Sequence, residues 1–546
     1  MINIRRLAAA VTALFLVAAV EVAGAPPAAA ADYVPITGSG STWSQNAIDQ
    51  WASNVEQYGM RVDYGGGGST LGRNQFASGL KDFGVSEIPY GKDDGAATEA
   101  RPPFPFAYMP IVAGGTAFMY NLEIGGRKVT NLRLSGDTVT KIFTNVITVW
   151  NDPAIKADNP GLALPARKIV PVVRSDGSGT TAQLTMWMAA RYPQLWNAYC
   201  AKAGRKSNPC GITSLYPLIR GSAMTAQSGS QNVSGYVAQR TSVGTITYVE
   251  YSYAKNLEFP VAKIRNAKDY YIEPTAESVA VALLAAKINN NKNSPDYLTQ
   301  DLSGVYAYGD DRAYPLSSYS YMLIPVDQEN NKFKATKGKT LGDFSYYFLC
   351  EGQQQAKKLG YSPLPINLVQ AGLEQVRRIP GVDVQNIDIK NCNNPTFSRS
   401  GKNTLAETAP HPDKCDRFGA TQCTRGTGGA QAETPTTNNG GGGAKTPTGN
   451  GATPGATTPA AGSTAGTGTG STGGGTTIDP DTGQVVGGAG AGTGGGDPAL
   501  AVPVSVGLQL DPALKTALIA LACVLLFALT VGPPLVARMT RRGDRR

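Results

Sequence analysis

The sequence predicts an α/β fold of two domains, carried between a secretory signal and a C-terminal membrane anchor. Strand-like runs alternate with polar loops and helix-like runs from Asp32 to about Cys423, a pattern that places ligands at the carboxyl ends of strands. That region is long enough for two domains. The remaining parts of the 546-residue chain have the compositions of export, linker and anchor segments.

The N-terminal residues 1–31 have the pattern of a secretory signal peptide. Two arginines precede the apolar run Leu7–Val20, and small residues ending at Ala31 precede Asp32. The apolar run is short for a membrane span, which makes an N-terminal anchor helix the less favoured alternative. We therefore expect an exported chain that begins at residue 32.

The C-terminal part predicts a stalk followed by a membrane span. Residues 426–500 are dominated by Gly, Thr, Ala and Pro, which cannot bury a core, so we expect this stalk to be disordered. Residues 513–537 are apolar enough for one transmembrane helix, with a buried core helix as the alternative. The basic residues 538–546 place the C-terminus in the cytoplasm.

The elements between these segments are assigned from periodicity and flanking turns. Strands are expected at 61–64, 83–86, 109–113, 117–120 and 168–173, and helices at 71–80, from 182 onward and at 277–284.

Loops rich in hydrogen-bond donors follow or precede these elements at 37–43, 65–70, 82–87 and 174–181. In the last of them, Arg174 precedes a Gly/Ser/Thr turn that opens a helix, and helix N-termini and guanidinium groups both favour oxyanions. The alternatives are ordinary helix caps and a surface ion pair between Arg174 and Asp176. Four such loops predict convergence on one anion.

Charge and cysteine usage narrow the possible functions. The net charge of +9 is not arranged as a basic stripe with aromatic residues, so nucleic acid is not expected. Six cysteines precede the expected span, and an even number in an exported chain favours disulfides. Proximity in sequence favours Cys200–Cys210 and Cys415–Cys423, which leaves Cys350–Cys392, although other pairings remain open. With no CxxC pair and a single histidine, His411, neither a metal nor a cofactor is expected.

Several motifs recur in an order that resembles one known family. The chain resembles the phosphate-binding protein (PstS) family, the extracytoplasmic receptors of phosphate ABC transporters, over most of residues 33–380. The motifs are Gly38-Ser39-Gly40-Ser41-Thr42-Trp43, Asp82-Phe83-Gly84-Val85-Ser86-Glu87, Val149-Trp150-Asn151-Asp152-Pro153, Arg174-Ser175-Asp176-Gly177-Ser178-Gly179-Thr180, Thr247-Tyr248-Val249-Glu250-Tyr251 and Leu359-Gly360-Tyr361-Ser362-Pro363.

The resemblance implies a type II periplasmic-binding-protein fold, in which two lobes joined by two crossover strands close over the ligand. The crossovers are expected near 111–118 and 317–324. The first lobe then comprises 32–112 and 318–425, the latter with a Cys-bearing extension, and the second lobe comprises 113–317.

The resemblance also implies a phosphate site with Asp176 orienting the guanidinium of Arg174. Glu87 departs from the family, which usually has Asp there; its carboxylate would accept the proton of hydrogen phosphate and repel sulfate. The implied ligands are Thr42, Trp43 (through its backbone N–H), Ser69, Glu87, Arg174, Ser178, Gly179 and Thr180.

The function expected from this resemblance is capture of inorganic phosphate outside the cell and delivery to the permease subunits of an ABC transporter, without catalysis. A membrane-tethered phosphate sensor or a surface adhesion protein is the alternative that the stalk and anchor raise. A phosphate-ester hydrolase is less favoured, because Ser178 lies in no G-x-S-x-G elbow and His411 lies outside the core.

Overall fold

The computed structural model describes most of the chain between the expected signal and the expected stalk. It divides the chain into two compact units, Met1–Lys445 and Thr446–Arg546. The described residues are 33–92, 99–206, 209–330, 333–383, 389–396 and 403–436, with the backbone of 477–478 and 485–486.

The expected signal (1–31), transmembrane helix (513–537) and cytoplasmic tail (538–546) lie outside the described residues. Within the described part of the chain, no helix combines the length and the apolar character needed to cross a bilayer. In the second unit, β16 (Thr477–Ile478) pairs antiparallel with β17 (Val485–Val486). The expectation of a stalk without secondary structure is therefore wrong for these two short strands.

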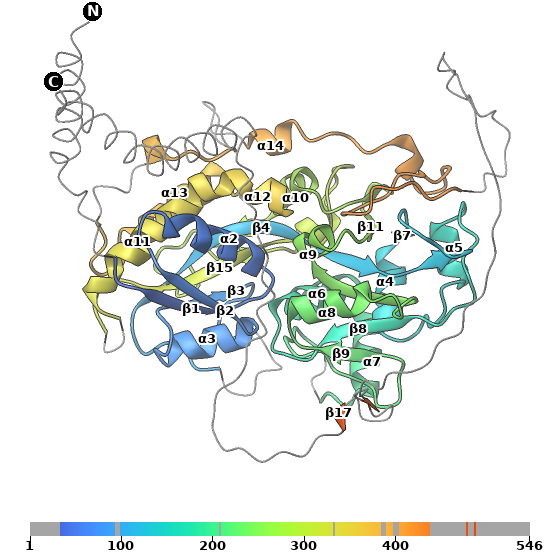
Figure 1. Cartoon of the computed structure of the whole chain (residues 1–546), viewed down its shortest axis with the longest axis horizontal. Helices are drawn as coiled ribbons and strands as arrows, with labels where there is room; N and C mark the ends of the chain where they lie inside the picture. The colour runs from blue at the N-terminus through green and yellow to red at the C-terminus, as the bar shows by residue number, and fades with distance from the viewer. Residues whose placement is uncertain are drawn as a thin grey trace, which may run out of the picture. The chain divides into compact units, whose positions relative to one another are not determined.

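A single path of hydrogen-bonded strands runs through the first unit in the order β2-β1-β3-β15-β4-β10-β8-β9 (Figure 1). The pairs β1–β2, β1–β3, β8–β10 and β8–β9 are parallel, and β15 and β4 run antiparallel to their neighbours. The bounds are β1 (Ile36–Gly40), β2 (Val62–Gly66), β3 (Phe83–Ser86), β4 (Phe106–Tyr120), β8 (Val170–Arg174), β9 (Thr225–Gln227), β10 (Thr245–Glu250) and β15 (Ser317–Pro325).

Strand β4 belongs to both halves of this path. Residues 106–115 pair with β15, and residues 116–120 pair with β10. We call the half that contains β1, β2 and β3 the first lobe, and the half that contains β8, β9 and β10 the second lobe. The two strands expected at 109–113 and 117–120 are thus one strand. Gly114, between the two expected ranges, is a point of close packing, because a Cβ there would lie 2.7 Å from Cη2 of Trp43.

Helices cover both faces of the first lobe, with α3 on the face opposite α2 and α11 (Figure 1). Trp51 of α2 stacks on Phe348 of α11 at 5.2 Å between ring centroids, and both are buried. Such aromatic pairs anchor the core of the lobe. The bounds are α2 (Gln45–Glu56), α3 (Ser69–Ala77), α11 (Ala335–Leu349) and α13 (Ile366–Val376) in the first lobe, and α6 (Gly179–Arg191), α7 (Pro193–Lys202), α8 (Gly229–Ala238) and α9 (Tyr251–Asn256) in the second.

Most expected elements are present with shifted ends. Helix α3 begins at Ser69, two residues before the expected start, because Gly68 at its N-cap adopts φ +95° and turns the chain directly into the helix. The helix expected at 277–284 is α10 (Ala276–Ala282), continued by a 3₁₀ turn. The strand expected at 168–173 is β8, which runs on to Arg174.

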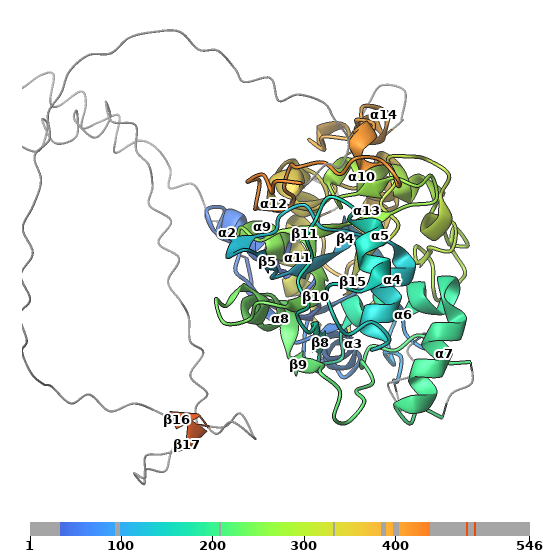
Figure 2. The ribbon, with the colours of Figure 1, turned by 90° about the vertical axis from the view of Figure 1, so that its right-hand side faces the viewer.

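The structure confirms the three favoured disulfides, Cys200–Cys210, Cys350–Cys392 and Cys415–Cys423. The last closes a loop in residues 403–436, which we call the C-terminal extension. Its helix α14 (Thr404–Glu407) packs on α10 (Figure 2).

The stalk boundary expected at residue 426 is wrong, because the extension continues along the second lobe to residue 436. Oγ1 of Thr427 accepts the N–H of Val261 at 3.1 Å, and Oγ1 of Thr434 accepts the N–H of Thr130 at 2.8 Å. Threonine hydroxyls therefore fix a segment whose composition lacks large apolar residues.

The buried carboxyl of Glu250 gives the fold a pH dependence. Glu250 ends β10, caps α9 by accepting the N–H of Ser252 at 2.7 Å, and is fully buried. Burial raises the pKa of Glu250 to about 8, whereas an unfolded chain loses this proton near 4.5. Between these values the folded state holds a proton that the unfolded state has released, so this group lowers stability as pH rises from about 5 to 8.

We predict that Glu250→Gln removes this contribution. The melting temperature of the unmodified protein should fall relative to that of the variant as pH rises from about 5 to 8, measured by thermal unfolding. Glu56→Gln, at an exposed position of α2, serves as the control. Parallel pH profiles for the unmodified protein and Glu250→Gln would contradict the prediction.

Candidate functional site

The residues predicted to bind an anion lie at the carboxyl ends of parallel strands in the two lobes. Thr42 follows β1, Ser69 opens α3 after β2, and Glu87 follows β3. Arg174 ends β8, and the turn after it leads into α6 at Gly179. The structure thus brings the four donor-rich loops together, as expected for strands whose carboxyl ends share an edge.

The guanidinium of Arg174 is buried and held by Asp176. Its Nε donates to Oδ1 of Asp176 at 2.7 Å, and its Nη2 donates to Oδ2. The Arg174 side chain is 1 % exposed and that of Asp176 10 %. Burial alone would raise the pKa of Asp176, but the hydrogen bond and charge of Arg174 lower it overall. Asp176 is therefore ionised at neutral pH and fixes the direction of the guanidinium.

Ser230 completes the surroundings of Arg174, and the sequence analysis missed it. Nη1 of Arg174 lies 3.1 Å from Oγ of Ser230 and 3.5 Å from Oγ1 of Thr180. Ser230 lies in the first turn of α8, where the N–H of Gly229 donates to Oδ1 of Asp176 at 2.8 Å. The run Ser228-Gly229-Ser230 is a donor-rich turn like the other loops of the site and could have indicated Ser230. The strand before it, β9, has only three half-buried residues, so the periodicity of the sequence did not reveal a strand there.

Thr42 links this cluster to the first lobe. Its Oγ1 lies 2.8 Å from Oγ of Ser230 and accepts the N–H of Ser230 at 3.1 Å. The backbone N–H of Trp43, expected to contribute to anion binding, donates to Oγ of Ser41 at 2.9 Å. The Trp43 ring is fully buried and packs edge-on against Tyr361 at 5.8 Å between centroids.

Glu87 points into the site. Its Oε2 accepts a hydrogen bond from Oγ of Ser69 at 2.7 Å, and the N–H of Gly179 donates to the same hydroxyl at 3.0 Å. A Cβ at position 179 would lie 1.9 Å from Oε2 of Glu87. The longer carboxylate is thus accommodated because residue 179 has no side chain.

The protonation of Glu87 is governed by burial. Its side chain is 1 % exposed, and burial raises its pKa above the ordinary range. Hydrogen bonds from Ser41, Ser69 and Ser320 and the charge of Arg174 oppose this shift by favouring the ionised form.

Further hydrogen bonds join the lobes around the site. The N–H of Thr70 donates to the carbonyl of Gly177 at 3.0 Å, and the Gln183 side chain donates to the carbonyl of Glu87 at 2.8 Å. Ser178 is fully buried, and its hydroxyl caps α6 by accepting the N–H of Thr181 at 3.1 Å. The lobes therefore meet closely at the predicted residues.

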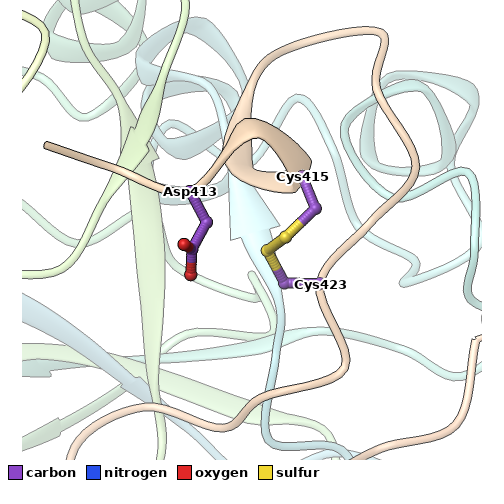
Figure 3. Close-up of side chains that lie close together, drawn as sticks. All are labelled: Asp413, Cys415 and Cys423. Atoms are coloured by element: carbon purple, nitrogen blue, oxygen red, sulfur yellow. A yellow bond between two sulfur atoms is a disulfide. The ribbon is translucent and has the colours of Figure 1, made fainter.

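Two other features lie outside this cluster. A cavity of about 530 Å³, lined by residues such as Leu283, Tyr319 and Leu368, contains none of the predicted anion ligands. Among the described residues, one group has metal-ligand side chains close together: Asp413, Cys415 and Cys423 (Figure 3). Its two sulfurs form a disulfide, so they offer no thiolate to a metal.

The arrangement suits a tetrahedral oxyanion that carries a proton. A fixed guanidinium, several buried hydroxyls and a helix N-terminus supply donors, and one buried carboxylate supplies an acceptor. His411, the histidine that a hydrolase would need as a base, lies on the surface beside Asp311 with its side chain 72 % exposed.

Comparisons with known proteins agree with this geometry. Residues 23–351 match the family model described as PBP superfamily domain. The chain is 31 % identical over 346 residues to the phosphate-binding protein PstS of Xylella fastidiosa (strain Temecula1), covering 63 % of this chain and 85 % of that protein. It is 29 % identical over 347 residues to PstS of Methanocaldococcus jannaschii, covering 62 % and 85 %. It is 31 % identical over 334 residues to PstS 3 of Mycobacterium tuberculosis (strain H37Rv), covering 60 % and 82 %.

The region matched by the family model includes all the loops that form the site, whereas the C-terminal extension lies beyond it. The buried Arg174–Asp176 pair, the hydroxyl donors and the strand order of the two lobes occur together in a chain that covers most of the length of these relatives. The chain belongs to the PBP superfamily and, within it, to the phosphate-binding protein (PstS) family.

Proposed function

We propose that this protein binds inorganic phosphate outside the cytoplasm and delivers it to the permease subunits of an ABC transporter. The observation that carries the proposal is the buried guanidinium of Arg174, fixed by Asp176 among hydroxyl donors with one carboxylate acceptor nearby. Such a set matches hydrogen phosphate, which accepts many hydrogen bonds and donates one. Members of this family are substrate-binding proteins, and we propose no catalytic step.

In this proposal both lobes contribute ligands. Arg174, Ser178, Gly179 and Thr180 bind from the second lobe, and Thr42, Ser69 and the N–H of Trp43 bind from the first. The hydroxyl of Ser178 and the N–H of Trp43 exchange their present partners for phosphate oxygens. Because the ligands come from both lobes, phosphate favours the closed arrangement by its differential affinity.

Glu87 supplies selectivity in this proposal. An ionised carboxylate accepts the proton of hydrogen phosphate, whereas sulfate has no proton at neutral pH and is repelled. The Glu87 carboxylate is buried and accepts a hydrogen bond from Ser69, which holds it beside the proposed anion ligands.

We also propose that residues 1–31 direct export and that residues 513–537 anchor the protein in the plasma membrane. The stalk between residue 436 and the anchor keeps the receptor near its transporter and raises its effective concentration there.

The same tether suits a surface phosphate sensor or adhesion protein, which would bind phosphate without supporting uptake. Phosphate uptake by cells that lack this protein, compared with unmodified cells, distinguishes the two.

We predict that the full-length protein, purified with detergent, binds phosphate much more tightly than sulfate in calorimetric titrations. Glu87→Gln should narrow this difference, because an amide no longer repels sulfate. Binding of phosphate should also weaken as pH falls through the raised pKa of Glu87, since the protonated carboxyl no longer accepts. Glu56→Gln is the exposed control; equal affinity of the unmodified protein for the two anions would refute the assignment.

We predict that Arg174→Lys weakens phosphate binding about 10- to 100-fold, because an ammonium cannot keep the forked contact with Asp176 while binding the anion. The matched control is Arg167→Lys, at an exposed arginine of the second lobe. Equal phosphate affinities for Arg174→Lys and the control would remove Arg174 from the site.

The proposed anchor is tested by cell fractionation. A chain ending at residue 500 should appear in the soluble extracytoplasmic fraction, whereas the full-length chain should remain with the membranes. Membrane association of the shortened chain equal to that of the full-length chain would contradict the anchor.

A further inference from the structure

The second oxygen of the Glu87 carboxylate faces a strand that the family motifs do not include. Oε1 of Glu87 lies 2.9 Å from Oγ of Ser320, on β15, while Oε2 accepts from Ser69. Oγ of Ser320 also lies 3.1 Å from Oγ of Ser44. The hydroxyl of Ser320 has a single proton for these two acceptors, and the carboxylate is the stronger acceptor. Ser320, Ser44 and Glu87 are all buried.

The backbone of β15 directs Ser320 at this carboxylate. The register of β15 against β4 shifts between Ser320 and Tyr321, where Ser320 pairs with Val112 and Tyr321 with Pro110. Irregularities of this kind re-aim side chains and are common beside binding sites. Ser320 thus contacts Glu87 from the strand that lies between β3 and β4.

The orientation of a carboxylate is fixed when each of its two oxygens accepts a hydrogen bond. With Oε1 held by Ser320, the plane of the Glu87 carboxylate is fixed so that Oε2 lies beside Ser69 and in front of Gly179. Without the contact to Oε1, the carboxylate of Glu87 loses one of the donors that restrain rotation about its terminal bond, and terminal torsions of Glu are broad.

We propose that Ser320 is a specificity-determining residue: by binding Oε1 of Glu87, it keeps Oε2 turned toward the anion, and so allows Glu to discriminate at a position where a shorter carboxylate would suffice. This inference rests on the proposed phosphate-binding function.

The other groups around Glu87 approach it from different elements. Ser41 and Ser69 donate from the loop after β1 and from α3, Gln183 of α6 binds the Glu87 carbonyl, and Arg174 is the positive charge that faces it. Tyr64 of β2 is the titratable neighbour, and its pKa is raised well above the ordinary range, first by burial and then by Glu87, so it stays neutral. Among these, Ser320 is the donor to Oε1 that lies outside the loops of the predicted site.

The test is a double-mutant cycle of Ser320→Ala with Glu87→Asp in the full-length protein, read by phosphate and sulfate titration. In the Glu87 background, Ser320→Ala should reduce the ratio of phosphate to sulfate affinity about tenfold, the loss of one hydrogen bond to a charged group. It should also move the acid limb of phosphate binding to higher pH, because the lost donor favoured the ionised carboxylate. In the Glu87→Asp background, Ser320→Ala should change the ratio less than about twofold, because the shorter side chain does not reach Ser320.

Ser318→Ala is the matched control. Ser318 lies on the same strand two residues away, is also buried, and its hydroxyl has no hydrogen-bond partner among the described residues. It should leave both affinities unchanged, and unfolding temperatures of all variants check that they fold.

Two outcomes would overturn the inference. Equal effects of Ser320→Ala in the Glu87 and Glu87→Asp backgrounds, or unchanged discrimination in Ser320→Ala with phosphate binding intact, would remove Ser320 from specificity and leave the proposed function standing. Failure of the unmodified protein to bind phosphate would instead overturn the proposed function, and this inference with it.

Discussion

The buried ion pair of Arg174 and Asp176 is the constraint on which the arrangement of the site depends. A guanidinium taken out of water is tolerated only when its charge is paired and its remaining donors have partners. Asp176 supplies the charge, and Ser230 and Thr180 lie beside Nη1. Asp176 in turn accepts the N–H of Gly229. The pair therefore joins the end of β8 to the starts of α6 and α8, and Ser230 carries the connection to Thr42 in the first lobe.

Glu87 follows a different physical rule. Burial raises the pKa of the Glu87 carboxyl, whereas hydrogen bonds from hydroxyl groups and the charge of Arg174 lower it. The ionised form of Glu87 is therefore stabilised by neutral donors as well as by Arg174. Serine is small enough to approach from three elements at once, which is why Ser41, Ser69 and Ser320 surround one carboxylate. The two carboxylates of the site thus have different environments: Asp176 is paired directly with a cation, whereas Glu87 accepts hydrogen bonds from neutral hydroxyl groups.

Local sequence predicted the parts of the structure that local chemistry determines. Glycine- and serine-rich loops after apolar runs located Thr42, Ser69, Glu87 and Arg174, and short cysteine spacings favoured the observed disulfides. The sequence did not predict Ser230 and Ser320 as residues of the site, because their roles arise from tertiary contacts across large sequence separations. The packing of residues 426–436 was not predicted for the same reason, since threonine hydroxyls bind backbone groups that are far away in sequence.

Strand β4 has a consequence for how the two lobes fold. Its first ten residues complete the sheet of the first lobe through β15, and its last five complete that of the second through β10. Without this shared strand the path would be interrupted between β15 and β10, and the two parts of β4 form one uninterrupted strand. Loss of β4 from one lobe would expose unpaired backbone groups in both. The two lobes are therefore coupled in stability, because disruption of β4 in one lobe removes strand pairing from the other as well.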